Sequence, residues 1–177
     1  MEPYTIRKAS ADDMEDMLRI YNSNPDFLKH HLARNRVDSA FMAEEMESMK
    51  EAGFCSCILS DVIAERTIGV LDYKEGPVVY LSLFMLDASL QGHGIGTQFW
   101  RFFEKEMRSR GYHTIRLDVV DDYEDNVKPF WERLGFCSCE RISLDWGNKR
   151  SAAQVMKKEI TGENQNGKNQ NNSGQHM

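Results

Sequence analysis

Residues 86–97 have the sequence LDASLQGHGIGT, in which Gly92, Gly94 and Gly96 alternate where an apolar run gives way to a helical pattern. Because glycine has no side chain, backbone N–H groups at such a turn can approach a ligand closely. A helix that begins here adds the unpaired amides of its first turn and the positive end of its dipole. The stretch therefore predicts a loop between a strand and a helix that binds an anion such as phosphate or pyrophosphate.

Spacing distinguishes this loop from two common phosphate-binding loops. The dinucleotide-binding pattern G-x-G-x-x-G fails in both frames, since its last position falls on Thr97 or on Phe99. The Walker pattern G-x-x-x-x-G-K-[ST] fails because no lysine directly follows the glycines. The glycines therefore belong to neither of these nucleotide-binding loops.

The apolar pattern around the glycines predicts an alternation of strands and helices. Ser10 and Asp13 have the spacing of a capping box that opens a helix, and residues 24–26, Asn-Pro-Asp, are interpreted as the break after it. Short polar turns between successive strands favour antiparallel pairing, and one strand–helix–strand unit adds a crossover. We therefore expect an α+β fold with a single mixed β-sheet flanked by helices. Strands are predicted at 4–7, 54–59, 67–73, 78–86, 115–119, 137–144 and 154–160, and helices at about 10–21, 38–50, 94–110 and 126–134.

Length and charge limit the classes of protein. The chain has 177 residues, of which 41% are apolar and 28% charged, as in an ordinary globular protein. Residues 161–177 are almost devoid of large apolar side chains and are predicted to form a disordered polar tail, which leaves residues 1–160 as one domain. Residues 1–90 carry a net charge of −7, from 9 basic and 16 acidic residues. An acidic chain without a basic stripe is a poor match for nucleic acid, which is not an expected partner.

Location and metal binding also follow from the sequence. No basic segment followed by an apolar run opens the chain, and the most apolar stretch, residues 78–86, is far shorter than the roughly 18 residues of a membrane span. A cytoplasmic location without a membrane partner is expected, with reduced thiols. The cysteines form Cys-Ser-Cys at 55–57 and at 137–139. In a strand such side chains lie about 6.6–6.8 Å apart, too far for two thiolates each about 2.3 Å from one zinc ion. No metal site is predicted.

Two blocks of sequence resemble a known family. Residues 91–96, Gln-Gly-His-Gly-Ile-Gly, match the Q/R-x-x-G-x-G/A motif of the GNAT superfamily of N-acetyltransferases, which lies between that family's fourth strand and third helix. Asn126 followed by residues 130–136, Phe-Trp-Glu-Arg-Leu-Gly-Phe, is similar to the family's N...FYEKLGF segment. With the order of the elements, the resemblance covers residues 4–160. It implies a GNAT-like fold, and acetyl-CoA or a related acyl-CoA as co-substrate.

The resemblance also implies which residues contact acetyl-CoA. Backbone amides at the start of the helix would hold the pyrophosphate, and the glutamine would shape the turn. Backbone groups at the end of the preceding strand, which in the family bulges and splays from its neighbour, would pair with the pantetheine arm, to which an asparagine adds a polar contact. The residues at these positions are Met85, Leu86, Gln91, Gly92, His93, Gly94, Ile95, Gly96, Thr97 and Asn126.

Catalysis in this family brings a neutral amine against the thioester carbon, with a backbone N–H that stabilises the oxyanion. An aliphatic amine has a pKa near ~10.4, so a base or a water relay must remove its proton. Carboxylates in or beside the central strands are Asp72, Glu75, Asp87 and Asp118, of which Asp87 is our candidate catalytic residue. The family's tyrosine, often the acid that protonates the CoA thiolate, is Trp131 here. Because an indole cannot act as an acid, Tyr123 in the preceding loop is the candidate acid.

The resemblance thus implies an acyl-CoA-dependent acyltransferase that acetylates a primary amine of a small cationic molecule or an amino terminus. The positive charge of the acceptor is inferred from four carboxylates in residues 121–125 and from the acidic residues 1–90, where the family's acceptor-side helices lie. His30 and His31 lie near those helices and are candidate pocket residues, although a surface position is the favoured expectation. The alternative is a non-catalytic acetyl-CoA-binding sensor or interaction module, which Trp131 favours. An O-acyltransferase and a homodimer both stay open.

Overall fold

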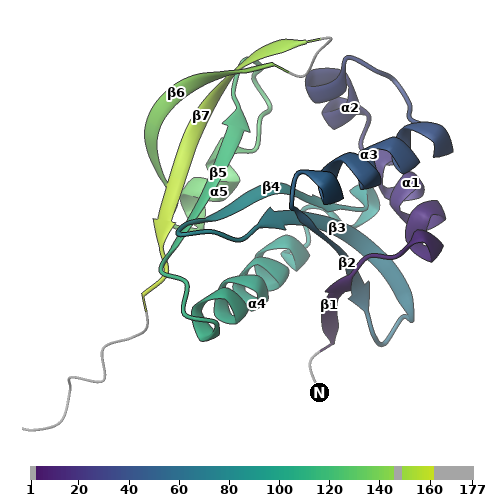
Figure 1. The fold of residues 1–177 in the computed structure, drawn as a ribbon, viewed down its shortest axis with the longest axis horizontal. Coiled ribbons are helices and arrows are strands. Elements are labelled where there is room, and N and C mark those ends of the chain that lie inside the picture. Colours follow the sequence, from purple (N-terminus) through teal and green to yellow (C-terminus); the bar gives the residue numbers. More distant parts are fainter. Residues whose placement is uncertain (1–2, 146–148, 162–177) are drawn as a thin grey trace, which may run out of the picture.

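The computed structural model describes residues 3–145 and 149–161. This part of the chain is built on one mixed sheet of seven strands in the order β1-β2-β3-β4-β5-β7-β6, with helices on both faces (Figure 1). The strands are β1 (Tyr4–Lys8), β2 (Cys55–Asp61), β3 (Arg66–Lys74), β4 (Val79–Leu86), β5 (Thr114–Val120), β6 (Cys137–Asp145) and β7 (Arg150–Glu159). The helices are α1 (Met14–Asn22), α2 (Pro25–Leu32), α3 (Ser39–Glu51), α4 (Ile95–Ser109) and α5 (Lys128–Arg133), with short 3-10 turns η1 (Ala11–Asp13) and η2 (Ala88–Leu90).

The sheet opens at strand β4. This strand pairs in parallel with β5 only over Val79–Leu81, against Ile115–Leu117, although both strands continue beyond that pairing. On its other edge, β4 shifts register opposite Asp72 and Tyr73 of β3, which leaves Ser82 as the extra residue of a β-bulge. Strands β4 and β5 therefore diverge from Ser82 onward.

The bulge also changes which side chains of β4 face each core. Before it, Val79 and Leu81 pack in the core beneath α4 and α5. After it, Leu83 and Met85 pack in the core beneath α1, α2 and α3. The first core is filled by aromatic and apolar side chains that include Phe99, Trp100, Phe103, Met107, Trp131 and Phe136. The second includes Met17, Ile20, Tyr21, Leu28, Val37, Met42, Ile58 and Val70.

The sequence predicts much of this arrangement correctly. The expected α+β fold with a single mixed sheet flanked by helices is confirmed. The capping box is present, since the Asp13 carboxylate accepts a hydrogen bond from the Ser10 N–H at 2.8 Å. Asp13 also forms an ion pair with Arg7, whose hydrogen bond is the largest cause that lowers the pKa of Asp13 to about 2. The start of the first helix is thereby joined to strand β1.

The interpretation of residues 24–26 as a simple break is wrong, because a second helix, α2, begins at Pro25. Proline is favoured at a first helical position, where its missing N–H would have had no partner and its fixed φ already suits the helix. Strand β7 begins at Arg150, four residues earlier than expected, because Arg150 pairs with Asp145 at the end of β6. Apart from Thr161, the predicted tail lies outside the described residues.

The cysteines differ from the expected spacing. The sulfur atoms of Cys55 and Cys57 are only 3.7 Å apart, since the two side chains lean toward each other on the same face of β2. Over residues 3–145 and 149–161, no group of three or more His, Cys, Asp or Glu side chains is arranged to hold a metal ion. Within the same residues, no helix is both long enough and apolar enough to cross a membrane.

Candidate active site

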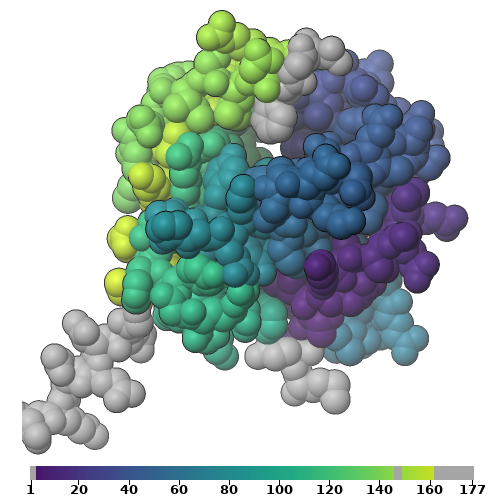
Figure 2. All heavy atoms as spheres, in the orientation of Figure 1, coloured from purple at the N-terminus to yellow at the C-terminus, as the bar shows by residue number. Residues whose placement is uncertain are grey.

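A cavity of about 600 Å³ occupies the opening between β4 and β5. Its strand walls are Leu81–Leu86 and Leu117–Val120, and further walls come from the glycine turn before α4, the corner between α1 and α2, helix α2 and the segment between β5 and α5. Figure 2 shows the molecule hollowed where α2 and α3 approach the strands. Backbone groups on the β5-facing edge of β4 have no strand partner there, so they can bond to a ligand.

The glycine turn forms one end of the cavity. Gly92 and Gly94 have φ angles of +77° and +79°, a left-handed conformation that other residues rarely adopt, and a Cβ atom at either position would meet nothing within 4 Å. Gly94 is the N-cap of α4, so the amides of the first helical turn after it have no partner within the helix. Open space, unpaired amides and the positive end of the helix dipole together form a concave surface suited to an anion.

The residues implied as contacts of acetyl-CoA separate into two groups. The cavity is lined by Met85, Leu86, Gln91, Gly92, Gly94, Gly96 and Thr97, but not by His93, Ile95 or Asn126. The Asn126 carboxamide is directed into its own loop, since it donates to the Tyr123 carbonyl at 2.7 Å and accepts from the Lys128 N–H at 3.0 Å. Its side chain therefore holds the loop that leads into α5.

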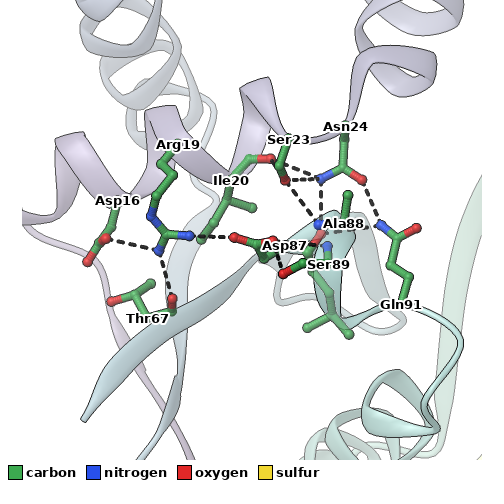
Figure 3. Close-up of polar contacts among 11 residues, drawn as sticks. Asp16, Arg19, Ile20, Ser23, Asn24, Thr67, Asp87, Ala88, Ser89 and Gln91 are labelled. Carbon is green, nitrogen blue, oxygen red and sulfur yellow. Dashed lines mark hydrogen bonds and ion pairs between the residues drawn. The ribbon is translucent and has the colours of Figure 1, made fainter. Parts of the chain in front are cut away.

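Asp87 lies beside the cavity but does not line it. Figure 3 shows its carboxylate between Arg19 of α1, at 2.5 Å, and Ser89, whose N–H and hydroxyl donate to it at 3.1 and 2.7 Å. Burial acts to raise the pKa of Asp87, but the hydrogen bonds from Ser89 outweigh it and lower the pKa below its ordinary value. This carboxylate is fully engaged in holding the turn that follows β4.

Tyr123 lines the cavity within an aromatic cluster that helix α2 completes. Its ring stacks on His30 at a centroid distance of 3.9 Å, and His31 lies edge-on to it at 6.4 Å. His31 also lines the cavity and stacks on Phe27 at 4.4 Å. Burial lowers the pKa of His31 to about 4 and raises the pKa of Tyr123, so at neutral pH the imidazole is uncharged and the phenol keeps its proton. Neither histidine is a simple surface residue.

Of the four carboxylates considered from the sequence, Asp118 is the one that lines the cavity. Its side chain, only 4% exposed, accepts hydrogen bonds from the Tyr80 hydroxyl at 3.1 Å and from the Arg116 guanidinium at 3.0 and 3.1 Å. Burial, followed by the nearby carboxylate, raises the pKa of Tyr80 far above its ordinary value, so its hydroxyl remains a donor. The alternation of Ile115, Leu117 and Val119 on β5 places Asp118 on the face opposite the core beneath α4, and the divergence of β4 from β5 after Leu81 leaves it on the cavity wall.

Further charges surround the same space. Asp26 of α2, Asp125 of the loop before α5 and Arg133 of α5 line the cavity together with Asp118. Trp131 is also a lining residue, but it is 6% exposed and packs edge-on against Trp100 at 5.2 Å, as a core side chain does. The cavity lining thus carries carboxylates on α2, on β5 and in the loop before α5, and a guanidinium on α5.

Two other carboxylates considered from the sequence lie elsewhere. Asp72 is buried beneath the helices on the α1–α3 face, where burial raises its pKa to about 6. Glu75 forms an ion pair with Arg110 and accepts a hydrogen bond from Tyr112 at 2.7 Å. Neither residue lines the cavity.

Comparisons with known proteins agree with this geometry. The sequence profile of the acetyltransferase (GNAT) family matches residues 11–136. No curated protein sequence matches the chain. Among solved structures, the ribosomal-protein-S18-alanine N-acetyltransferase of Escherichia coli is 16% identical, with 92% of this chain and 97% of that chain covered and a TM-score of 0.63.

Two further structures have the same fold. An acetyltransferase from Thermus thermophilus is 16% identical, covers 88% of this chain and 96% of its own, and gives a TM-score of 0.72. The spermidine N-acetyltransferase of Vibrio cholerae, solved in complex with CoA and spermine, is 14% identical. The match covers 90% of this chain and 97% of that chain, with a TM-score of 0.67. At these identities the likeness is one of fold, and it agrees with the predicted sheet and flanking helices.

Proposed function

Since the chain belongs to the GNAT acetyltransferase family, as the match over residues 11–136 shows, we propose that it transfers an acetyl group from acetyl-CoA to a primary amine. The acceptor in this proposal is a small cationic molecule or an amino terminus. One observation supports it: the glycine turn and the polar side chains of His31, Asp118 and Tyr123 line a single cavity between two diverging strands. Donor and acceptor can therefore meet inside one space.

The donor half of the cavity fits CoA. Gly92 and Gly94 leave room where a side chain would obstruct a pyrophosphate, and the first-turn amides of α4 are the donors that such a group requires. The free edge of β4, up to Met85 and Leu86, offers backbone partners to the amides of the pantetheine arm. Arg133 also lines the cavity and could contribute a positive charge to the binding of the anionic donor.

The acceptor half has the charge that a cationic amine requires. Asp26, Asp118 and Asp125 line it, and His31 is held neutral by burial, so no positive charge of its own opposes the amine. In the Vibrio cholerae structure the same fold holds spermine, a polycation, together with CoA. Polyamines and other small diamines are therefore the first acceptors to test.

Proton transfer in this proposal involves two side chains. Asp118, fixed by Tyr80 and Arg116, binds the acceptor ammonium and takes one of its protons, which frees the nitrogen lone pair to attack the thioester carbon. The nitrogen of the tetrahedral adduct loses its second proton to water as the C–S bond breaks, and water returns a proton to Tyr123 after the thiolate has left. Desolvation in the cavity lowers the amine pKa toward the range in which a carboxylate can take the proton. Tyr123 stays protonated because burial raises its pKa, so it can donate a proton to the departing CoA thiolate in place of the family's usual tyrosine, which is Trp131 here. Asp87, engaged by Arg19 and Ser89, supports the turn.

A thiol-release assay tests the proposal. The protein is incubated with acetyl-CoA and, separately, with spermidine, putrescine, lysine methyl ester and short peptides with free amino termini, and the products are identified by mass spectrometry. We expect CoA release that depends on the amine and an N-acetylated product. Binding of CoA without acyl transfer to any acceptor would instead support the non-catalytic acetyl-CoA-binding module, and an ester product would indicate an O-acyltransferase.

A further inference from the structure

The corner between α1 and α2 is bonded directly to the segment that leads from β4 into the glycine turn (Figure 3). Asn24, the residue of this corner, donates from its Nδ2 to the Leu86 carbonyl and to the Ile20 carbonyl, both at 2.9 Å. Its Oδ1 accepts from the Gln91 Nε2 at 2.7 Å. One carboxamide therefore contacts the last residue of the strand, the first residue of the glycine motif and the end of its own helix.

Neighbouring side chains of α1 extend this connection. The Ser23 hydroxyl accepts from the Ala88 N–H at 3.0 Å and donates to the Ile20 carbonyl at 2.7 Å. Arg19 bonds to Asp87 at 2.5 Å and to the Thr67 carbonyl at 2.8 Å. The whole segment between β4 and Gln91 is thus held from one side by a single helix end.

Asn24 differs from these neighbours because it also lines the cavity, as do Leu86 and Gln91. The corner itself is rigid: Pro25, with its fixed φ, begins α2 immediately after Asn24, and the Asn24 carbonyl accepts the Leu28 N–H at 3.2 Å. A side chain that bonds to two parts of a turn restricts the conformations of that turn before a ligand binds. Less conformational entropy is then lost on binding, so the ligand binds more tightly.

We propose that Asn24 is a positioning residue, which sets the geometry of the pyrophosphate-binding turn from the acceptor side of the cavity. The proposal rests on the proposed function, since it takes CoA as the ligand of the turn. Loss of Asn24 leaves the Leu86 carbonyl and the Gln91 carboxamide without this partner and lets the turn adopt other conformations. Because each part-buried hydrogen bond changes an equilibrium by a few-fold to about tenfold, we expect CoA affinity to fall roughly tenfold in Asn24→Ala.

The chain offers a matched control at Asn22, on the same helix end. Its carboxamide also makes two hydrogen bonds, to the Val37 carbonyl at 3.0 Å and from the Val37 N–H at 2.9 Å, which join α1 to the segment before α3. Asn22 does not line the cavity. Asn22→Ala therefore removes a similar pair of bonds, with a similar effect on folding, but leaves the turn untouched.

The experiment is a calorimetric titration of CoA into the full chain, for the wild type, Asn24→Ala, Gln91→Ala, the double variant and Asn22→Ala. We expect a roughly tenfold weaker Kd in Asn24→Ala, a few-fold weaker Kd in Gln91→Ala, and a Kd within twofold of wild type in Asn22→Ala. Asn24 and Gln91 share one hydrogen bond, and both donate to the Leu86 carbonyl, Gln91 at 3.3 Å, so the loss in the double variant should be smaller than the sum of the two single losses. In acetyl transfer, the KM for acetyl-CoA should rise while kcat at saturation stays within about twofold.

Several results would overturn the inference: an unchanged Kd in Asn24→Ala, an equal loss in Asn22→Ala, or fully additive losses in the double variant. If the alanine variant fails to fold, Asn24→Leu keeps a side chain of similar size without adding a charge and loses the bonds to Leu86 and Gln91, and it must also weaken CoA binding. A wild type that binds no CoA would refute the proposed function together with this inference, whereas wild-type binding with an unaffected Asn24→Ala would refute the inference alone.

Discussion

Replacement of Gly94 by glutamate tests the proposed anion site most directly. The residue has a φ of +79°, so any side chain there costs roughly 1–2 kcal/mol of folding free energy. A Cβ would meet nothing within 4 Å, so the substitution causes no clash in the folded protein. The new carboxylate would lie at the mouth of the turn, where a unit negative charge about 5 Å from a phosphate charge costs about 3 kcal/mol at an effective dielectric constant of ~20. We therefore expect CoA affinity to fall at least about a hundredfold.

Gly111 provides the control for backbone strain and for charge. Its φ is +86°, and a Cβ there also meets nothing within 4 Å. It lies just beyond the other end of α4, a helix about 22 Å long. Gly111→Glu should lose similar stability in urea denaturation but keep its CoA affinity. The Gly94→Glu defect should also lessen as salt screens the repulsion. An affinity of Gly94→Glu within a few-fold of Gly111→Glu would refute the assignment of the turn.

Three further predictions concern single side chains. Asp118→Asn should lower kcat/KM for cationic amines by about 10²-fold or more while the Kd for CoA changes less than twofold, and steady-state kinetics with unchanged kcat/KM would contradict its role. Tyr123→Phe should lower kcat by roughly tenfold or more; because burial raises the pKa of Tyr123, any fall in kcat on the alkaline side of the wild-type profile should be absent in the variant. Asp13 has its pKa lowered to about 2 by Arg7, so its contribution to stability is present above pH 4 and lost as the pH falls toward 2. Since Arg7 is half exposed and solvent screens the pair, Asp13→Asn should lose only about 1 kcal/mol at pH 7 and show a shallower acid destabilisation than wild type in urea titrations at stepped pH.

The sequence predicts the glycine turn well, because the turn is encoded locally. Alternating glycines weaken a helix start unless a tight turn or a close ligand requires them, and Gly92 and Gly94 indeed adopt left-handed conformations around open space. The acceptor side is predicted poorly, because it depends on helix α2. Helix α2 begins at Pro25, directly after the break that follows α1. An interpretation of Pro25 as only a break misses this helix, which brings His30 and His31 against Tyr123.

Direction of side chains is the other information that a single sequence lacks. Asn126 and Asp87 both lie within a few residues of the cavity, but hydrogen-bond partners nearby in the chain hold their polar groups away from it. Asp118 lies on the cavity only because β4 stops pairing with β5 after Leu81. That divergence depends on a pairing between strands far apart in the sequence, and no local pattern of residues reports it.

The bulge at Ser82 limits which insertions and deletions strand β4 can accept. Before the bulge, the odd-numbered side chains of β4 face the core beneath α4; after it, they face the core beneath α1–α3. The single extra residue therefore reverses which face of the sheet each later side chain occupies. Deletion of Ser82 would exchange the environments of Leu83, Phe84, Met85 and Leu86 in one step, and would also close the divergence from β5. For the fold, length is thus under tighter constraint than side-chain identity at this position: we expect the fold to tolerate substitutions of Ser82, but no insertion or deletion.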